Sequence, residues 1–298
     1  MLNFNLSPEQ IAIQKEARDF ALKELLPVAW EYDQREETPM HILHKAYDAG
    51  LINGDIPKEY GGRGFGVLEG VIATEELSAA CPGLATSIFD NSLGMEPLIL
   101  CKNETAKQKY LSTITKDRKF FAFATSEPTM GSDVSSLRCQ ARPDGDDYIL
   151  NGTKFWITNG GIADYVTVFA TVDPQLAHEG ICAFVVETAW EGVTAGRHIP
   201  KLGQRGSNTT AVNLKDVITS LGFLPAALAA ASASRRCFFW PSVRIDASVF
   251  RASNTFGVCS FESALILETC SSVSSAFAKR FSGDGLAACW RFGTFGEM

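Results

Sequence analysis

Two short segments contain residue types suited to binding a flat, polar ligand. In the first, 126–133, Pro128 fixes the direction of the chain and Gly131 lets the main chain come close to a ligand. The second segment brings Trp156 next to the hydroxyl of Thr158. Hydroxyls, exposed amides and one aromatic face suit a planar heteroaromatic that is hydrogen-bonded along an edge and covered on one side. A flavin is such a molecule.

The spacing alone leaves a plainer interpretation open. Strand-like runs at 120–126 and 153–158 bracket the stretch. A pair of β-hairpins with a Pro-Gly turn and a core tryptophan would give the same pattern. Because short motifs often match by chance, that structural interpretation is the commoner outcome for two segments taken by themselves.

Five motifs taken as a set are far more specific. They are Pro57-x-x-Tyr60-Gly61-Gly62-x-Gly64, Asn91-Ser92-Leu93-Gly94, Ser126-Glu127-Pro128-x-x-Gly131-Ser132-Asp133, Asn151-Gly152-x-Lys154-x-Trp156-Ile157-Thr158-Asn159-Gly160 and Lys201-Leu202-Gly203-x-Arg205-Gly206-Ser207-Asn208-Thr209. In this order and at this spacing they resemble the acyl-CoA dehydrogenase family, and the residues of the motifs are closest to those of its medium-chain branch. The resemblance covers about residues 5–217, and the family's C-terminal domain is not recognisable.

The resemblance implies an FAD-dependent oxidoreductase of fatty-acid β-oxidation. Such an enzyme removes hydrogen from the α and β carbons of an acyl-CoA thioester and gives a trans-2-enoyl-CoA. Its electrons pass to an electron-transferring flavoprotein, and the family forms homo-oligomers. The cofactor carries the redox chemistry, while the protein positions and polarises it.

The resemblance also implies which residues contact the cofactor. They are Phe123, Ala124, Thr125, Ser126, Gly131, Ser132, Trp156, Ile157 and Thr158. Trp156 would cover the flavin ring, the Thr158 hydroxyl would lie near flavin N5, and Ser132 would also touch the acyl-CoA. The family usually has threonine in place of Ser126, which keeps the hydroxyl, and small residues in place of Thr129 and Met130.

The catalytic base is not found. In the family it is a glutamate of the C-terminal domain, and none of Glu262, Glu268 and Glu297 lies in a matching context. Isolated glutamates of this kind are mostly solvated surface groups. Glu127, which precedes Pro128, is interpreted as a turn residue that shapes the flavin loop.

Two alternatives to an active dehydrogenase therefore stay open. The first is a catalytically incompetent family member that at most binds ligand, produced by a reading-frame change or aberrant splice just after Val217. The abrupt change in composition there supports it, since 218–298 contain a single lysine, Lys279. The second and weaker alternative is an acyl-CoA oxidase.

The predicted fold class is α+β, in three parts. Residues 1–116 form a helical domain, 117–217 an antiparallel β-barrel or sandwich, and 218–298 an atypical, poorly specified tail in place of the family's helical domain. The ligand cleft is expected between the first two parts.

Local signals place the expected helices. Ser7 and Gln10 form a capping box at the start of the first helix, and Asn103 caps the last one. Other helices are expected at 41–49 and 67–80, and an apolar segment at 84–100 is expected to be interrupted around Gly94 and Pro97.

Alternating apolar residues place the strands. They are expected at 137–142, 148–150, 166–170, 182–186, 193–199 and 209–214. Pro143-Asp144-Gly145 predicts one turn, and Asn151-Gly152 predicts the next.

Composition narrows the partners and the location. A net charge of −7 and a pI near 5.2 argue against nucleic acid. No run approaches the roughly 20 apolar residues of a membrane span, and no presequence is visible. The eight cysteines follow no metal spacing and indicate reduced thiols of a soluble intracellular protein, in the cytoplasm or mitochondrial matrix. His41 and His44 lack further ligands, so no metal site is expected.

Overall fold

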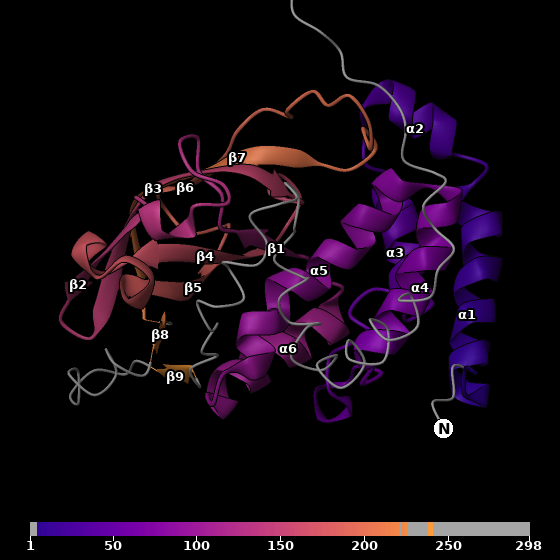
Figure 1. The fold of residues 1–298 in the computed structure, drawn as a ribbon, viewed down its shortest axis with the longest axis horizontal. Helices are drawn as coiled ribbons and strands as arrows, with labels where there is room; N and C mark the ends of the chain where they lie inside the picture. The colour runs from indigo at the N-terminus through magenta and orange to yellow at the C-terminus, as the bar shows by residue number, and fades with distance from the viewer. Residues whose placement is uncertain (1–4, 221, 226–237, 241–298) are drawn as a thin grey trace, which may run out of the picture. The chain divides into compact units, whose positions relative to one another are not determined.

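The computed structural model describes residues 5–220, 222–225 and 238–240, which form helices followed by a sheet (Figure 1). The helices are α1 (Pro8–Phe20), α2 (Ala29–Arg35), α3 (Met40–Asp48), α4 (Val67–Ala80), α5 (Pro82–Leu100) and α6 (Glu104–Asp117). A π-helical turn, Ala21–Leu25, continues α1. The sequence signals missed α2.

The predicted helix caps are confirmed. The Ser7 hydroxyl accepts a hydrogen bond from the Gln10 amide at 3.2 Å, and the Gln10 side chain accepts one from the Ser7 amide at 2.9 Å. At the start of α6 the Asn103 side chain accepts from the Ala106 amide at 3.1 Å. Local chemistry therefore fixes where these two helices begin.

The predicted interruption of 84–100 is wrong, because α5 is one continuous helix. Gly94 is required by packing, since an added Cβ would lie 3.0 Å from main-chain atoms of Ala122. Pro97 removes one hydrogen bond from the helix, but the neighbouring Met95 and Leu98 are fully buried. Tertiary packing outweighs the local cost of the proline.

The sheet follows α6 and contains nine strands in the described ranges. They are β1 (Phe121–Ala124), β2 (Gln140–Asp144), β3 (Asp147–Thr158), β4 (Tyr165–Thr171), β5 (Ile181–Glu187), β6 (Val193–Ala195), β7 (Thr209–Thr219), β8 (Gly222–Pro225) and β9 (Phe238–Trp240). Their order is β6-β7-β3-β2-β4-β5-β8-β9, and β1 pairs with β4.

The sheet is mixed, which corrects the prediction of an antiparallel domain. β1 runs parallel to β4, with Phe121 opposite Tyr165, and β8 runs parallel to β9. After β1 the chain leaves the sheet at residue 125 and returns in β2. The partner of β1 is β4, which comes later in the sequence. Side-chain alternation does not encode that choice. The sheet also continues past Val217, and the rest of the predicted tail lies outside the described residues.

The two predicted turns have different outcomes. The turn at Gly145 is confirmed, because Asp144 pairs with Asp147 across it. Asn151-Gly152 is not a turn, since both residues lie inside β3 at a register shift against β7. A Cβ on Gly152 would lie 2.8 Å from the Cys139 sulfur, so this glycine allows a close approach of two strands.

Helix α5 packs against β1 and connects the helices to the sheet (Figure 1). The Phe121 amide donates to the Asn91 side chain at 2.8 Å, and the Thr167 hydroxyl donates to the Gly94 carbonyl at 2.6 Å. The Asn159 side chain donates to the Ser87 carbonyl at 2.8 Å. These buried bonds fix the register of α5 on the sheet.

Other sequence expectations concern cysteines, metals and membranes. The four cysteines of the described residues, at positions 81, 101, 139 and 182, are free and buried. No group of three potential metal ligands gathers within 5–220. Among the helices of the described part, none has the length and apolar content to cross a membrane.

Candidate functional site

The two predicted segments lie side by side, held by hydrogen bonds. The Phe155 amide donates to the Ser126 carbonyl at 2.9 Å. The Lys154 amine donates to the Thr125 carbonyl at 2.9 Å and to the Glu127 carboxylate at 2.8 Å. The end of β3 therefore fixes the chain that leaves β1.

Trp156 lies at a β-bulge. Lys154 pairs with Val212 and Ile157 with Thr210, so two residues of β3 lie opposite one residue of β7. Trp156 has a left-handed backbone, with φ of 64°, and 54% of its surface is exposed. A bulky residue in this region carries strain of about 1–3 kcal/mol, and such strain is frequent at binding sites. The bulge therefore directs a large aromatic face away from the core.

The turn after Ser126 leaves space beside Gly131. Glu127 and Met130 exchange two main-chain hydrogen bonds, at 2.9 and 3.2 Å. The Met130 side chain is buried in the core, so its size does not obstruct the outer side of the turn. A Cβ added at Gly131 would meet nothing within 4 Å. Packing within the described residues does not require this glycine, whereas close approach of a ligand would.

The Thr125 hydroxyl oxygen is buried and has no hydrogen-bond partner among the described residues. An unsatisfied buried hydroxyl costs about 1–3 kcal/mol, so a bound polar group that supplies the partner would remove this cost. This hydroxyl, the open space at Gly131 and the exposed indole of Trp156 fit a planar ligand with polar edges, as a flavin has.

The remaining predicted contacts fall into two groups. Ala124 and Ile157 are buried, main chain included. Phe123 and Thr158 are half-buried and Ser132 is exposed. The turn after Thr158 is fixed by residue 208, whose carbonyl accepts from the Asn159 amide at 2.9 Å. The assignment of these residues to a cofactor stays a prediction.

A buried ion pair was missed by the sequence analysis. The Glu127 and Lys154 side chains are 4% and 0% exposed. The Glu127 carboxylate also accepts from the amides of Arg138 and Cys139, at 2.9 and 2.8 Å. Glu127 does form the predicted turn, but its side chain anchors three parts of the chain. One signal could have indicated this pair. The alternation of β3 puts Lys154 on the same buried face of the strand as Leu150, and a buried lysine needs an acidic partner.

Burial governs the ionisation of the groups around this pair. It lowers the pKa of Lys154, and the hydrogen bond and charge of the nearby Glu127 oppose that shift. Burial raises the pKa of the Cys139 thiol to about 11, so the thiol stays protonated at neutral pH. The ion pair is therefore the charged centre of an apolar region.

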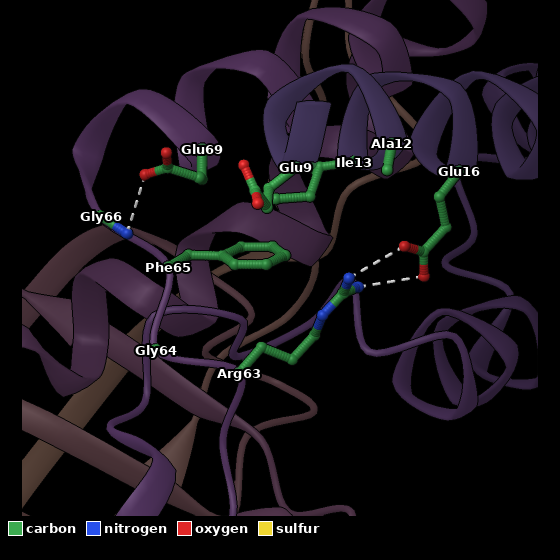
Figure 2. Close-up of a pocket in the computed structure, with 9 residues that line it drawn as sticks. All are labelled: Glu9, Ala12, Ile13, Glu16, Arg63, Gly64, Phe65, Gly66 and Glu69. Carbon is green, nitrogen blue, oxygen red and sulfur yellow. Dashed lines mark hydrogen bonds and ion pairs between the residues drawn. The ribbon is translucent and has the colours of Figure 1, made fainter. Parts of the chain in front are cut away.

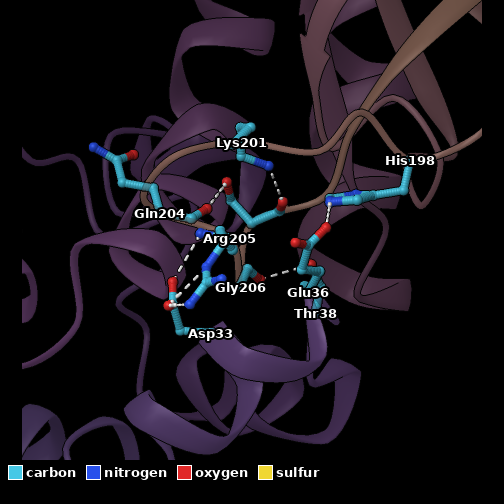
Figure 3. Close-up of polar contacts among 9 residues, drawn as sticks. Asp33, Glu36, Thr38, His198, Lys201, Gln204, Arg205 and Gly206 are labelled. Atoms are coloured by element: carbon cyan, nitrogen blue, oxygen red, sulfur yellow. Dashed lines mark hydrogen bonds and ion pairs between the residues drawn. The ribbon is translucent and has the colours of Figure 1, made fainter.

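A second group of polar contacts, which we call the clamp, joins α2 to the loop before β7 (Figure 3). Arg205 donates to Asp33 from its main-chain amide at 3.0 Å and from its guanidinium at 2.9 and 2.6 Å. The Thr38 hydroxyl donates to the Gly206 carbonyl at 2.8 Å. The fifth sequence motif thus connects the helices to the turn that follows Thr158.

A surface pocket of about 520 Å³ lies in the helical part, between α1 and the loop before α4 (Figure 2). Its lining includes Glu9, Glu16, Arg63, Phe65 and Glu69. The Arg63 guanidinium donates to the Glu16 carboxylate at 3.0 and 2.9 Å. This pocket contains none of the predicted ligand residues, and the predicted cleft between the helices and the sheet stays a prediction.

Comparisons with known proteins agree with the motifs. The family model for the N-terminal domain of acyl-CoA dehydrogenases matches residues 7–118, and that for the middle domain matches 122–217. A probable medium-chain specific acyl-CoA dehydrogenase from Caenorhabditis briggsae is 36% identical over 219 residues, 72% of this chain and 54% of the relative. The human short-chain specific acyl-CoA dehydrogenase is 40% identical over 201 residues, 67% of this chain and 48% of the relative.

A solved structure supports the same relationship. A glutaryl-CoA dehydrogenase from Mycobacterium smegmatis, in complex with FADH2, aligns with a TM-score of 0.67 and 30% identity, over 73% of this chain and 55% of that one. The present chain spans about half the length of the curated relatives it matches.

Proposed function

The chain belongs to the acyl-CoA dehydrogenase family, and we propose that it binds FAD and serves the α,β-dehydrogenation of an acyl-CoA thioester to a trans-2-enoyl-CoA. The observation that carries this proposal is the exposed, strained Trp156 beside the 125–132 segment, with its open glycine and unsatisfied threonine hydroxyl. Bound FAD would supply the two-electron oxidation.

The residues of this chain would hold and orient that cofactor. Trp156 would cover one face of the ring, while the hydroxyls of Thr125, Ser126 and Thr158 and nearby main-chain amides would bind its polar edge. A donor close to the position where negative charge develops stabilises it most. We assign that position to Thr158 and a contact with the acyl-CoA to Ser132.

Reconstitution with FAD tests the proposal directly. We expect a yellow protein that keeps flavin absorption after gel filtration, and a Trp156→Ala variant that loses much of it. The matched control is Trp30→Ala, which removes an exposed indole from α2, where 77% of the residue is exposed. Equal flavin retention in all three proteins would contradict the assignment of Trp156.

The complete reaction also needs a base that removes the α-proton. General-base catalysis accelerates such a proton transfer by about 10²–10⁴-fold. Glu262, Glu268 and Glu297 lie outside the described residues, and none has the sequence context of the family's base. We therefore expect very low turnover by this chain alone.

Adding a straight-chain acyl-CoA without oxygen separates the alternatives. Rapid bleaching that one of Glu262→Gln, Glu268→Gln or Glu297→Gln abolishes would show a competent dehydrogenase. Bound flavin that does not bleach would support the catalytically incompetent alternative. Bleaching followed by fast recovery in oxygen would support the oxidase alternative.

The remaining assignments extend the proposal. The electron acceptor is an electron-transferring flavoprotein, and the assembly is a homo-oligomer. The domains start from the predicted parts 1–116, 117–217 and 218–298, with the second part extended past Val217 to include the end of β7 and β8. The two relatives described above carry the word mitochondrial in their names. We keep the mitochondrial matrix or the cytoplasm as the location, which cell fractionation tests.

A further inference from the structure

The ion pair between Glu127 and Lys154 lies at the point where the two ligand segments meet, although neither side chain is exposed to a ligand. Lys154 belongs to β3 two residues before Trp156, and Glu127 follows Ser126. Both side chains are almost fully buried. The pair can therefore affect ligand binding only indirectly, through the positions of the residues to which it is hydrogen-bonded.

The Glu127 carboxylate is the acceptor on which three donors converge. One oxygen accepts from the Cys139 amide and the Lys154 amine, and the other accepts from the Arg138 amide. The carboxylate thus connects the turn after β1 to the two residues just before β2 and to β3. Three donors can be satisfied together only by a group that has two acceptor oxygens and no N–H of its own.

Lys154 extends these contacts to the main chain of the other segment. Its amine also donates to the Thr125 carbonyl at 2.9 Å, and the next residue, Phe155, donates to the Ser126 carbonyl at 2.9 Å. The carbonyls of two successive residues, Thr125 and Ser126, therefore accept hydrogen bonds from β3. This arrangement fixes the orientation of the main chain at Thr125, whose hydroxyl has no hydrogen-bond partner among the described residues.

The same contacts hold the bulge that carries Trp156. A left-handed tryptophan is strained, and such a conformation persists only where surrounding contacts determine it more than once. The bulge begins directly after Lys154, and its first residue, Phe155, is hydrogen-bonded to Ser126 and lies edge-on to the Trp156 ring at 5.3 Å.

We propose that Glu127 and Lys154 are positioning residues for the cofactor, which hold the 125–127 segment and the Trp156 bulge in the binding geometry before FAD arrives. This inference rests on the proposed function. Preorganisation lowers the cost of ordering on binding, so its loss should weaken FAD binding without removing any contact to FAD.

Glu127→Gln is the sharpest variant because it keeps shape and volume. Glutamine offers one acceptor oxygen and an NH₂ group, which would face a donor. Lys154→Met is the second variant, since it keeps the length of the stem but removes both amine hydrogen bonds. Leu111→Ala is the matched control, because it weakens a fully buried position of α6 in a core cluster that contains no residue of either segment.

The FAD dissociation constant should be measured in the full chain at a temperature at which every variant is folded. We expect both pair variants to bind FAD at least about tenfold more weakly, which corresponds to ~1.4 kcal/mol, and Leu111→Ala to bind within about twofold of the parent. Equal affinity in all four proteins, or equal weakening in all three variants, would overturn the proposal.

Hydrogen exchange without FAD gives an independent measurement. We expect faster exchange at the amides of Arg138, Cys139 and Phe155 in Glu127→Gln, but not in Leu111→Ala. Unchanged exchange at these amides would overturn the inference. Failure of the parent protein to bind FAD would instead overturn the proposed function, and exchange would still decide whether the pair positions the two segments.

Discussion

Two ion pairs in this chain join segments that are distant in sequence, and they differ in what surrounds them. Glu127 and Lys154 are 27 residues apart and are 4% and 0% exposed. Asp33 and Arg205, in the clamp, are 172 residues apart and are 34% and 25% exposed. The first pair connects the turn after β1 to β3 in the protein interior, and the second connects a helix to a surface loop.

The difference in exposure gives the two pairs different physical roles. Burial removes hydration from both charges, so a buried pair is weak evidence for stability, and its value lies in the geometry that it imposes. A partly exposed pair keeps some hydration, is screened by salt, and contributes little energy. We infer that the buried pair fixes a binding geometry, whereas the clamp fixes how a loop docks on α2.

The largest effect should come from breaking the buried pair. Lys154→Met leaves the Glu127 carboxylate buried with two amide donors and no opposite charge, and we expect the free energy of unfolding to fall by about 3–5 kcal/mol. Urea unfolding measures this change. A smaller loss than that caused by Asp33→Asn would reverse our ranking of the two pairs.

The double variant Glu127→Leu/Lys154→Met sharpens the comparison. It removes both charges, but the amides of Arg138 and Cys139 then lose their acceptor. We therefore expect it to stay less stable than the parent, because buried unpaired amides are costly. Full recovery of stability would show that the pair acts through its charges alone.

Trp156→Gly should have opposite effects on stability and on binding. Glycine tolerates φ of 64° and relieves a left-handed strain of about 1–2 kcal/mol, so the protein without FAD should unfold at a higher temperature. FAD binding should weaken because the indole is gone. Thermal unfolding and FAD titration measure the two effects, and Trp156→Ala, which keeps the strain, is the control. A lower melting temperature for the glycine variant would contradict a strained bulge.

The sequence was sufficient for features that depend on neighbouring residues. The capping box at Ser7, the cap at Asn103 and the turn at Gly145 each involve residues three or fewer positions apart, and all three are confirmed. The family motifs identified the N-terminal and middle domains for a different reason, since they match a known pattern across many positions.

Features that depend on distant residues could not be predicted in this way. The pairing of β1 with β4, the Glu127–Lys154 pair and the clamp are each set by packing between separate parts of the chain. Asn151-Gly152 has the composition of a turn, yet Cys139 lies against Gly152 and the strand continues. Tertiary contacts override local preference where a glycine or proline is needed for packing.

The threonine hydroxyls of the two regions offer a smaller contrast. The Thr125 hydroxyl is buried without a partner in the described part of the chain, whereas the Thr38 hydroxyl in the clamp donates to Gly206 at 2.8 Å. Thr125→Val should therefore stabilise the protein without FAD by about 1 kcal/mol, and Thr38→Val should destabilise it by about 1 kcal/mol. Differential scanning calorimetry tests both signs. Destabilisation by Thr125→Val would show that its hydroxyl is already satisfied.

The smallest effect concerns the pH dependence of the clamp. The hydrogen bonds from Arg205 lower the pKa of Asp33 in the folded protein below its ordinary value near 3.9. A carboxylate whose folded pKa is depressed stabilises the protein above its unfolded pKa, and that stability is lost as the pH falls through the folded value. Because Asp33 is about one-third exposed, we expect its contribution to be at most ~1 kcal/mol.

Asp33→Asn isolates this contribution. The stability difference between the parent and the variant should be full at pH 6, should shrink as the pH falls below about 4, and should also shrink in 1 M salt because an exposed pair is screened. The difference caused by Lys154→Met should respond much less to salt, since its pair is buried. Urea unfolding at each pH and salt concentration measures both. Equal salt sensitivity of the two variants would mean that burial does not separate the pairs, and the different roles assigned to them would fail together.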